Sequence, residues 1–267
     1  MAIADNLATL RERIARAAAR AGRNPDAVTL VAVSKTFPAE KIREAHAAGV
    51  RHFGENRVQE WESKQPLVAD LDATWHLVGH LQNNKARRAA SLFHAIDSVD
   101  SLALAQKLDR ARSETIRGSE LQPRHKAAEK WEAALAPEVV AQRLPILIEV
   151  RLSPELTKCG VHPDDLPALA EGILALPHLD LRGLMTIPPL LNTPEDVRPY
   201  FRRLREIRDA LRERLASVAP SPLSPEPSPL PSLLPELSMG MSHDFEVAIE
   251  EGATQIRLGT ALFGERS

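Results

Sequence analysis

Thr29-Leu30-Val31-Ala32-Val33-Ser34-Lys35-Thr36 is the stretch around which the rest of the chain is organised. Its apolar run is typical of a strand covered on both faces, as in a parallel sheet. The run ends at Lys35, and Phe37-Pro38 then opens a helical pattern. Burial at the end of such a strand disfavours the ammonium form of a lysine. The stretch therefore predicts either an amine that can attack carbonyl groups or a lysine that points into solvent.

Length, charge and composition limit the classes of protein. A chain of 267 residues has the length of one α/β barrel. The net charge is −2 and the basic residues are dispersed, which does not indicate a nucleic-acid-binding surface. The single cysteine, Cys159, excludes an internal disulfide and fits a reducing compartment. Without an apolar segment of membrane-spanning length or a signal-peptide pattern in residues 1–21, we expect a cytoplasmic protein.

Strand-like and helix-like patterns alternate along the chain. After the first strand, further strands are expected at residues 50–54, 74–79, 92–99, 146–152, 181–187, 236–238 and 255–258. Helices are expected at residues 39–48, 58–67, 163–176, 195–217 and 242–251, with an extra N-terminal helix that ends near Gly22. The alternation favours an α/β fold, a single closed (β/α)8 TIM-type barrel with all strand exits on one rim. We expect residues 1–267 to form one domain.

Two segments interrupt this alternation. Residues 117–144 are longer than a barrel connection and contain an amphipathic, charged stretch, so we expect an inserted helix on the outside. Residues 218–235 carry seven prolines, and proline at this density cannot supply the hydrogen bonds of a helix or sheet. This composition favours a surface loop over a binding site for a proline-recognising partner.

Small, glycine and hydroxyl residues follow the last two expected strands, in Leu237–Ser242 and in Ile256–Gly264. Backbone N–H groups in such turns can approach an anion closely, and hydroxyls add donors. In (β/α)8 barrels the loops after strands seven and eight often bind phosphate. In a closed ring Lys35, after strand one, would stand next to strand eight. An amine beside a phosphate site indicates an aldehyde phosphate held as a Schiff base.

These stretches resemble the YggS/PROSC family of pyridoxal phosphate homeostasis proteins, whose fold is similar to the N-terminal barrel domain of alanine racemase. The resemblance covers nearly the whole chain in order, with residues 117–144 and 218–235 as insertions. The matching stretches are residues 31–36, 53–56, 75–85, 158–160, 182–188, 237–242 and 257–264.

The resemblance implies that Lys35 carries pyridoxal 5′-phosphate (PLP) as an internal aldimine. It further implies contacts of the cofactor phosphate, pyridine nitrogen and ring with other residues: Ser238, Gly259 and Thr260 at the phosphate, Arg257 at the nitrogen, and Asn56, Met185 and Met239 along the pocket. Lys158 is a second basic residue of interest in the family, and no role is assigned to it.

The chemistry of these residues favours a carrier over a catalyst. An arginine has only donors and stays charged. Arg257 would therefore keep the pyridine nitrogen unprotonated and make the ring a poor electron sink. Racemases with this arrangement add a tyrosine from a second domain, which we expect this chain to lack; its single tyrosine, Tyr200, is expected in a helix away from the rim. We expect a monomeric, non-catalytic PLP-binding protein in intracellular PLP homeostasis, with PLP-dependent apo-enzymes as recipients.

Two enzymatic alternatives remain open. A weak PLP-dependent amino-acid racemase would use Lys35 on one face and His80 or another rim residue on the other. A class I aldolase barrel would use Lys35 on a sugar phosphate without a cofactor. His76 and His80 could also suggest a metal site, but no further cluster completes a ligand set, so we expect a structural role for them and no metal.

Overall fold

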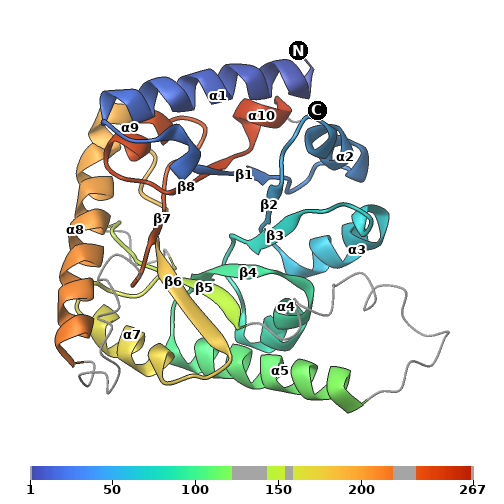
Figure 1. The fold of residues 1–267 in the computed structure, drawn as a ribbon, viewed down its shortest axis with the longest axis vertical. Helices are drawn as coiled ribbons and strands as arrows, with labels where there is room; N and C mark the ends of the chain where they lie inside the picture. Colours follow the sequence, from blue (N-terminus) through green and yellow to red (C-terminus); the bar gives the residue numbers. More distant parts are fainter. Residues whose placement is uncertain (1, 122–142, 154–158, 219–232, 266–267) are drawn as a thin grey trace.

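Eight parallel strands form a closed barrel in the order β1-β2-β3-β4-β5-β6-β7-β8, with helices around it (Figure 1). The computed structural model describes residues 2–121, 143–153, 159–218 and 233–265. The strands are β1 (Thr29–Val33), β2 (His52–Glu55), β3 (Thr74–Leu77), β4 (Ala95–Val99), β5 (Leu144–Glu149), β6 (Leu179–Met185), β7 (Glu236–Ser238) and β8 (Gln255–Leu258). The expected α/β barrel is confirmed.

Helices lie on the outside of the ring; the first precedes β1, the last follows β8, and the others connect successive strands. They are α1 (Ile3–Arg20), α2 (Ala39–Ala47), α3 (Val58–Val68), α4 (Ala86–Leu92), α5 (Leu102–Leu121), α7 (Leu166–Leu174), α8 (Pro194–Val218), α9 (Phe245–Glu250) and α10 (Thr260–Phe263), with short 3-10 turns η1 (Pro25–Ala27) and η2 (Asn83–Lys85). Among the described residues, none of these helices combines the length and the apolar character that crossing a membrane requires.

The extra N-terminal helix is present as α1, which lies along α9 and α10 (Figure 1). Its buried residues Ile3, Leu7, Leu10 and Ile14 recur at helical spacing and so form one apolar face. Asn6 donates from Nδ2 to the carbonyl oxygen of Leu262 at 2.9 Å. Helix α1 therefore covers the elements that follow β7 and β8.

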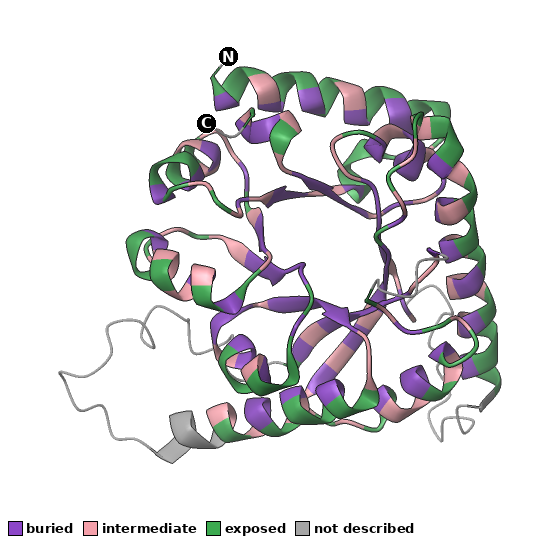
Figure 2. Ribbon diagram, turned by 180° about the vertical axis from the view of Figure 1, so that it is seen from behind, coloured by how far each residue is buried: buried purple, intermediate pink, exposed green. Residues whose placement is uncertain are grey.

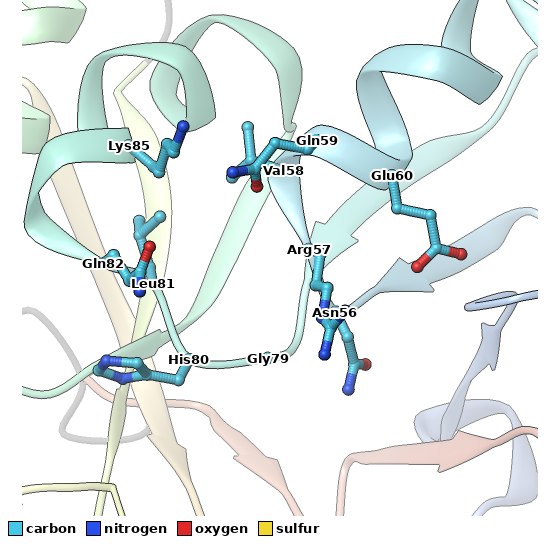
Figure 3. A pocket seen from close by; sticks show the side chains of 10 residues that line it. All are labelled: Asn56, Arg57, Val58, Gln59, Glu60, Gly79, His80, Leu81, Gln82 and Lys85. Atoms are coloured by element: carbon cyan, nitrogen blue, oxygen red, sulfur yellow. The ribbon is translucent and has the colours of Figure 1, made fainter.

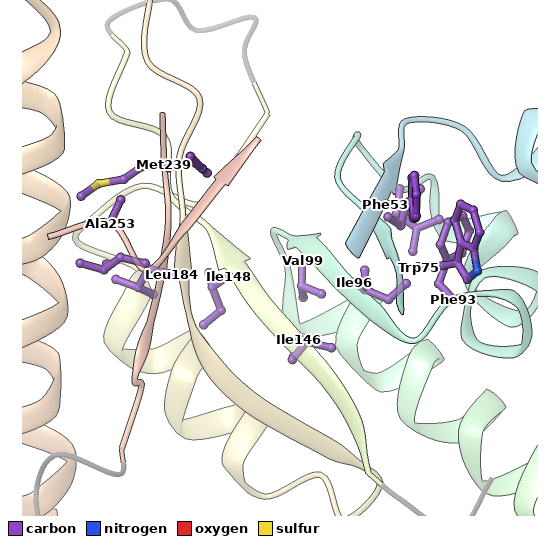
Figure 4. Packing of buried hydrophobic residues seen from close by; sticks show 14 of the residues in the cluster. Phe53, Trp75, Phe93, Ile96, Val99, Ile146, Ile148, Leu184, Met239 and Ala253 are labelled. Carbon is purple, nitrogen blue, oxygen red and sulfur yellow. The ribbon is translucent and has the colours of Figure 1, made fainter. Parts of the chain in front are cut away.

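The hydrophobic core lies between the barrel wall and the helices. Figure 2 shows buried residues along the strands and exposed residues on the outer helix faces. On one side of the barrel, Phe53, Trp75, Trp61 and Phe93 form a series of ring contacts, with 4.0 Å between the centroids of Trp61 and Trp75 (Figure 4). Trp61 Nε1 donates to the Leu92 carbonyl oxygen at 3.0 Å, so the buried indole N–H is satisfied.

Most of the expected strands have other bounds in the structure. The second lies at His52–Glu55 and not at 50–54, and the third ends at Leu77 and not at residue 79. The fourth begins at Ala95 and not at residue 92, because α4 continues to Leu92. The fifth and sixth lie at Leu144–Glu149 and Leu179–Met185, about two residues earlier than expected. The chain leaves β6 at Thr186, whose hydroxyl donates to the Val150 carbonyl oxygen at 2.8 Å. The apolar runs alone did not reveal where these ends lie.

The two expected insertions fall largely outside the described residues. Residues 117–121 continue α5, and Leu144 is the first residue of β5. Its remainder, 122–142, lies outside the described part of the chain, as do residues 219–232 of the proline-rich segment. Val218 is the last residue of α8.

Candidate functional site

The first and last strands close the ring next to each other, and this places Lys35 and Gly259 on one rim. Strands β1 and β8 pair in parallel, with Ala32 opposite Leu258. A Cβ atom built on Gly259 would lie 3.5 Å from the Val33 carbonyl oxygen, so the ends of the two strands are in contact. Lys35 follows Val33 by two residues and is half-buried. The chain therefore leaves β1 toward Lys35 and β8 toward Thr260 at neighbouring points of the same rim.

The turn after β7 lies on the same rim, next to β8 and α10. Gly240 has a φ of +94°, and a Cβ atom there would lie 2.5 Å from the Ala248 Cβ, so this position requires glycine. The Gly240 carbonyl oxygen accepts from the Arg257 N–H at 2.9 Å. Ser242 Oγ accepts from the N–H of Ala261 in α10 at 3.2 Å. The two small-residue turns are thus bonded to each other.

Ser238 and Arg257 form the buried floor of this region. Arg257 donates from Nη1 to Ser238 Oγ at 2.7 Å and from Nη2 to the Thr186 carbonyl oxygen at 2.8 Å. Burial lowers the pKa of Arg257, while the carboxylates of Asp97, Glu149 and Asp244 raise it. Ser238 Oγ keeps its own proton for a further acceptor, because a hydroxyl both donates and accepts.

Glu149, at the end of β5, is a titratable residue that the sequence analysis missed. It is only 6% exposed, and its register partner is Met185, which in turn pairs with Ser238. Burial raises its pKa to about 7, the charge of Arg257 lowers it, and Asp100 raises it. One feature of the sequence could have revealed it. Glu149 is a carboxylate at the end of the apolar run that forms β5, and a strand of a parallel sheet is expected to be buried on both faces.

Asn56 follows β2 and lines a cavity of about 830 Å³ between the exits of β2 and β3 (Figure 3). Arg57, His80 and Lys85 are also among its lining residues. A Cβ atom on Gly79 would clash with the Asn56 carbonyl oxygen, so the two exits approach closely because residue 79 is glycine. Asn56 is half-buried and stands on the rim of the barrel.

The remaining predicted residues differ in exposure. Met185 is buried at the end of β6. Met239 belongs to the main hydrophobic cluster, near Ala253 (Figure 4). Thr260 is exposed at the start of α10. Lys158 lies outside the described residues.

His76 and His80 occupy different environments. His76 lies inside the barrel, with Nε2 3.1 Å from His52 Nδ1 and Nδ1 3.3 Å from Asp97 Oδ1. Asp97 Oδ2 also accepts from Gln255 Nε2 at 2.6 Å. His80 lies beyond the end of β3 and is exposed. In the described part of the chain, no group of three or more His, Cys, Asp or Glu residues could hold a metal ion.

The rim thus joins three kinds of groups: a half-buried amine, the hydroxyls and glycines of two linked turns, and a buried guanidinium. At the start of α10 the Ala261 N–H is already bonded to Ser242 Oγ, so the donor that this helix can add is the N–H of its first residue, Thr260. Such a set can hold a small anion at one end and react with a carbonyl group at the other.

Comparisons with known proteins agree with this arrangement. The family model for the alanine racemase N-terminal domain matches residues 6–267. A pyridoxal phosphate homeostasis protein of Aquifex aeolicus is 44% identical, over 98% of this chain and 97% of its own. One of Pseudomonas aeruginosa is also 44% identical, over 99% of this chain and 96% of its own. The structure of PipY from Synechococcus elongatus with PLP bound has a TM-score of 0.73 and 39% identity, covering 98% of this chain and all of that one.

Proposed function

The chain belongs to the family of pyridoxal phosphate homeostasis proteins, which share the fold of the alanine racemase N-terminal domain, and on this basis we propose that it binds PLP on Lys35 and takes part in PLP homeostasis. The observation that supports the proposal is the contact between the ends of β1 and β8, because Lys35 follows the first of these strands and Gly259 and Thr260 follow the second. PLP has an aldehyde for the amine and a phosphate for the turns.

The donor set fits this cofactor. Lys35 would hold the aldehyde carbon as a Schiff base, and PLP supplies there an aldehyde that exchanges reversibly between primary amines. Ser238, Gly259 and Thr260 would bind the phosphate through hydroxyl and N–H donors. Arg257 would face the pyridine nitrogen, and Asn56, Met185 and Met239 would line the rest of the pocket.

Several features favour holding the cofactor over catalysis. Arg257 is buried and offers only donors, so it would leave the pyridine nitrogen without a proton. Carbanion chemistry on PLP gains from a protonated ring nitrogen. The single tyrosine of the chain, Tyr200, lies in α8 and not at a strand end. We therefore propose a carrier without marked catalytic activity.

We further propose that the protein is a monomer in the cytoplasm. In this proposal it passes PLP to PLP-dependent apo-enzymes. The single cysteine supports a reducing compartment. Light scattering coupled to size-exclusion chromatography tests the monomer, and a dimer would contradict it.

An absorbance spectrum with borohydride reduction and intact mass tests the Lys35 linkage. The purified protein incubated with PLP should show a visible band. Reduction should add one phosphopyridoxyl group, a gain of the mass of PLP less one oxygen atom, because the imine forms with loss of water and borohydride then adds two hydrogens. Lys35→Ala should lose both signals, whereas Lys41→Ala, which changes an exposed lysine of α2, should keep them. Failure of the wild-type protein to form the band, or a reduced adduct on the Lys35→Ala variant, would contradict the proposal.

A further inference from the structure

Lys64 of α3 is bonded to three acceptors behind the Lys35 loop. Its Nζ donates to the Ser34 carbonyl oxygen at 3.0 Å, to Glu55 Oε1 at 3.1 Å and to Glu60 Oε1 at 2.6 Å. An ammonium group has three donors, so all of them are used. The side chain is only 12% exposed, so water screens these contacts weakly. Lys64 therefore joins α3 to the ends of β1 and β2.

The buried carboxyl of Glu55 depends on its contact with Lys64. Its side chain is fully buried, and Oε1 accepts from both Ser34 Oγ, at 2.8 Å, and Lys64. Its other oxygen, Oε2, has no hydrogen-bond partner among the described residues. Burial raises the pKa of Glu55, and the nearby ammonium of Lys64 lowers it. Removal of Lys64 would leave a buried carboxyl without its neutralising partner.

Thr36, on the other side of Lys35, is held by the same group of residues. Its φ is +67°, a left-handed conformation that β-branched residues rarely adopt. Such a conformation persists only where the surroundings hold it. The Thr36 N–H donates to Glu60 Oε1, the oxygen that also accepts from Lys64. The Ser34 carbonyl oxygen accepts from Phe37 N–H at 3.1 Å, which closes the turn over Lys35.

We propose that Lys64 is a positioning residue for Lys35, because it fixes the residues on both sides of that lysine through Ser34, Glu55 and Glu60. The inference rests on the proposed function, in which Lys35 binds PLP. Preorganisation of a binding group lowers the entropy lost on binding. Lys64 itself lies on the outer side of the barrel wall, with α3, so it acts through the backbone of Lys35 and not by contact with the cofactor.

The test replaces the ammonium and follows both the loop and the cofactor. In Lys64→Met without PLP, the peptide containing Thr36 and Phe37 should exchange its amide hydrogens faster, while peptides of α7 keep their rates. With PLP, the affinity should fall about tenfold or more, as expected when charged hydrogen bonds are lost. The circular dichroism of the bound cofactor, which reports its pose, should also change. Lys64→Arg should recover part of the affinity, since it keeps the charge and donors.

Two further variants keep the test decisive. Lys41→Met is the matched control, because Lys41 forms an exposed ion pair with Glu44 on α2; it should bind PLP as the wild type does. Glu60→Ala serves as the second variant if Lys64→Met does not fold. It removes the carboxylate that accepts from the Thr36 N–H, and the Glu60 side chain is 25% exposed. This variant should also weaken PLP binding.

The outcomes separate this inference from the function on which it rests. A wild-type protein without the PLP band overturns the proposed function and this inference together. A wild-type band with unchanged affinity and circular dichroism in Lys64→Met, or in Glu60→Ala, overturns the positioning role of Lys64 alone. Faster amide exchange without any change in PLP binding also overturns it, because the pose of the loop would then not matter to the cofactor.

Discussion

Arg257 donates a 2.7 Å hydrogen bond to the hydroxyl of Ser238, so two proposed cofactor residues from neighbouring strands hold each other in place. Both side chains are buried. Arg257 is oriented by a second bond, to the Thr186 carbonyl oxygen. The guanidinium is therefore a fixed part of the barrel floor before any ligand arrives, so a ligand that it contacts loses less entropy on binding.

Ser238→Ala should weaken both the fold and PLP binding. The substitution leaves one buried donor of Arg257 without its acceptor, which costs about 1–3 kcal/mol. It also removes a hydroxyl from the proposed phosphate site. Urea unfolding of the PLP-free protein measures the first effect and a PLP titration measures the second. The control is Ser91→Ala, since the Ser91 hydroxyl donates to the Arg88 carbonyl oxygen of the same helix, α4. Equal affinities for the wild type and Ser238→Ala would exclude the phosphate role of Ser238.

Gly240→Ala should destabilise the turn between β7 and α9. The new Cβ atom would meet the Ala248 Cβ at 2.5 Å in addition to the strain of a positive φ. Gly22→Ala is a matched control, because Gly22 also has a positive φ, of +64°, but nothing lies within 4 Å of its added Cβ.

The Gly22 variant should lose only the conformational term, about 1–2 kcal/mol, and the Gly240 variant clearly more. Thermal or urea unfolding gives the two free energies. PLP affinity should fall only in Gly240→Ala, because that turn connects Ser238 to α9. If the two variants are equally stable, crowding at Ala248 is not what requires the glycine.

The sequence predicted the elements of the barrel better than the contacts within the site. The alternation of apolar strands and amphipathic helices is local, and it was enough to place Lys35, Ser238 and Thr260 at strand ends on one rim. The bond between Arg257 and Thr186, 71 residues apart, forms because β6, β7 and β8 lie side by side in the folded sheet. The start of β4 was predicted too early since Leu92, an apolar residue, ends a helix and does not begin a strand.

The Lys64 contacts and Glu149 were missed for a related reason. Lys64 and Glu60 are four residues apart on a helix, a spacing that commonly gives surface ion pairs. Nothing local shows that the pair packs against the turn at Thr36. Glu149 closes an apolar run in the sequence, and only the fold shows that this carboxyl shares a register layer with Met185 and Ser238.

The PLP-loaded protein should leave the α-deuteron of labelled alanine in place at the rate seen with free PLP. Arg257 offers no acid to the ring nitrogen, so the carbanion that exchange requires is poorly stabilised. Mass spectrometry of the alanine follows the exchange. Exchange well above that of free PLP, lost in both Lys35→Ala and His80→Ala, would instead establish the weak racemase that uses these two residues.

Glu149 should make the PLP-free protein less stable as the pH rises from about 4.5 to 7. Burial raises its pKa from 4.5 to about 7 in the folded protein. In this window the unfolded chain releases the proton of Glu149 and the folded protein retains it. The unfolded state then binds fewer protons, and the free energy of unfolding falls until the pH exceeds the folded pKa.

Glu149→Gln removes this dependence, because the amide has no proton to lose. The variant should match the wild type near pH 4.5 and exceed its stability by up to ~3 kcal/mol at pH 8, from a shift of about 2.5 units at 1.36 kcal/mol each. Urea unfolding at several pH values, without PLP, gives the difference. Glu114→Gln, at an exposed position on α5, is the control. A stability difference between Glu149→Gln and the wild type that stays constant from pH 4.5 to 8 would mean that the carboxyl ionises in the folded protein as it does in water, and that its burial beside Arg257 carries no electrostatic cost.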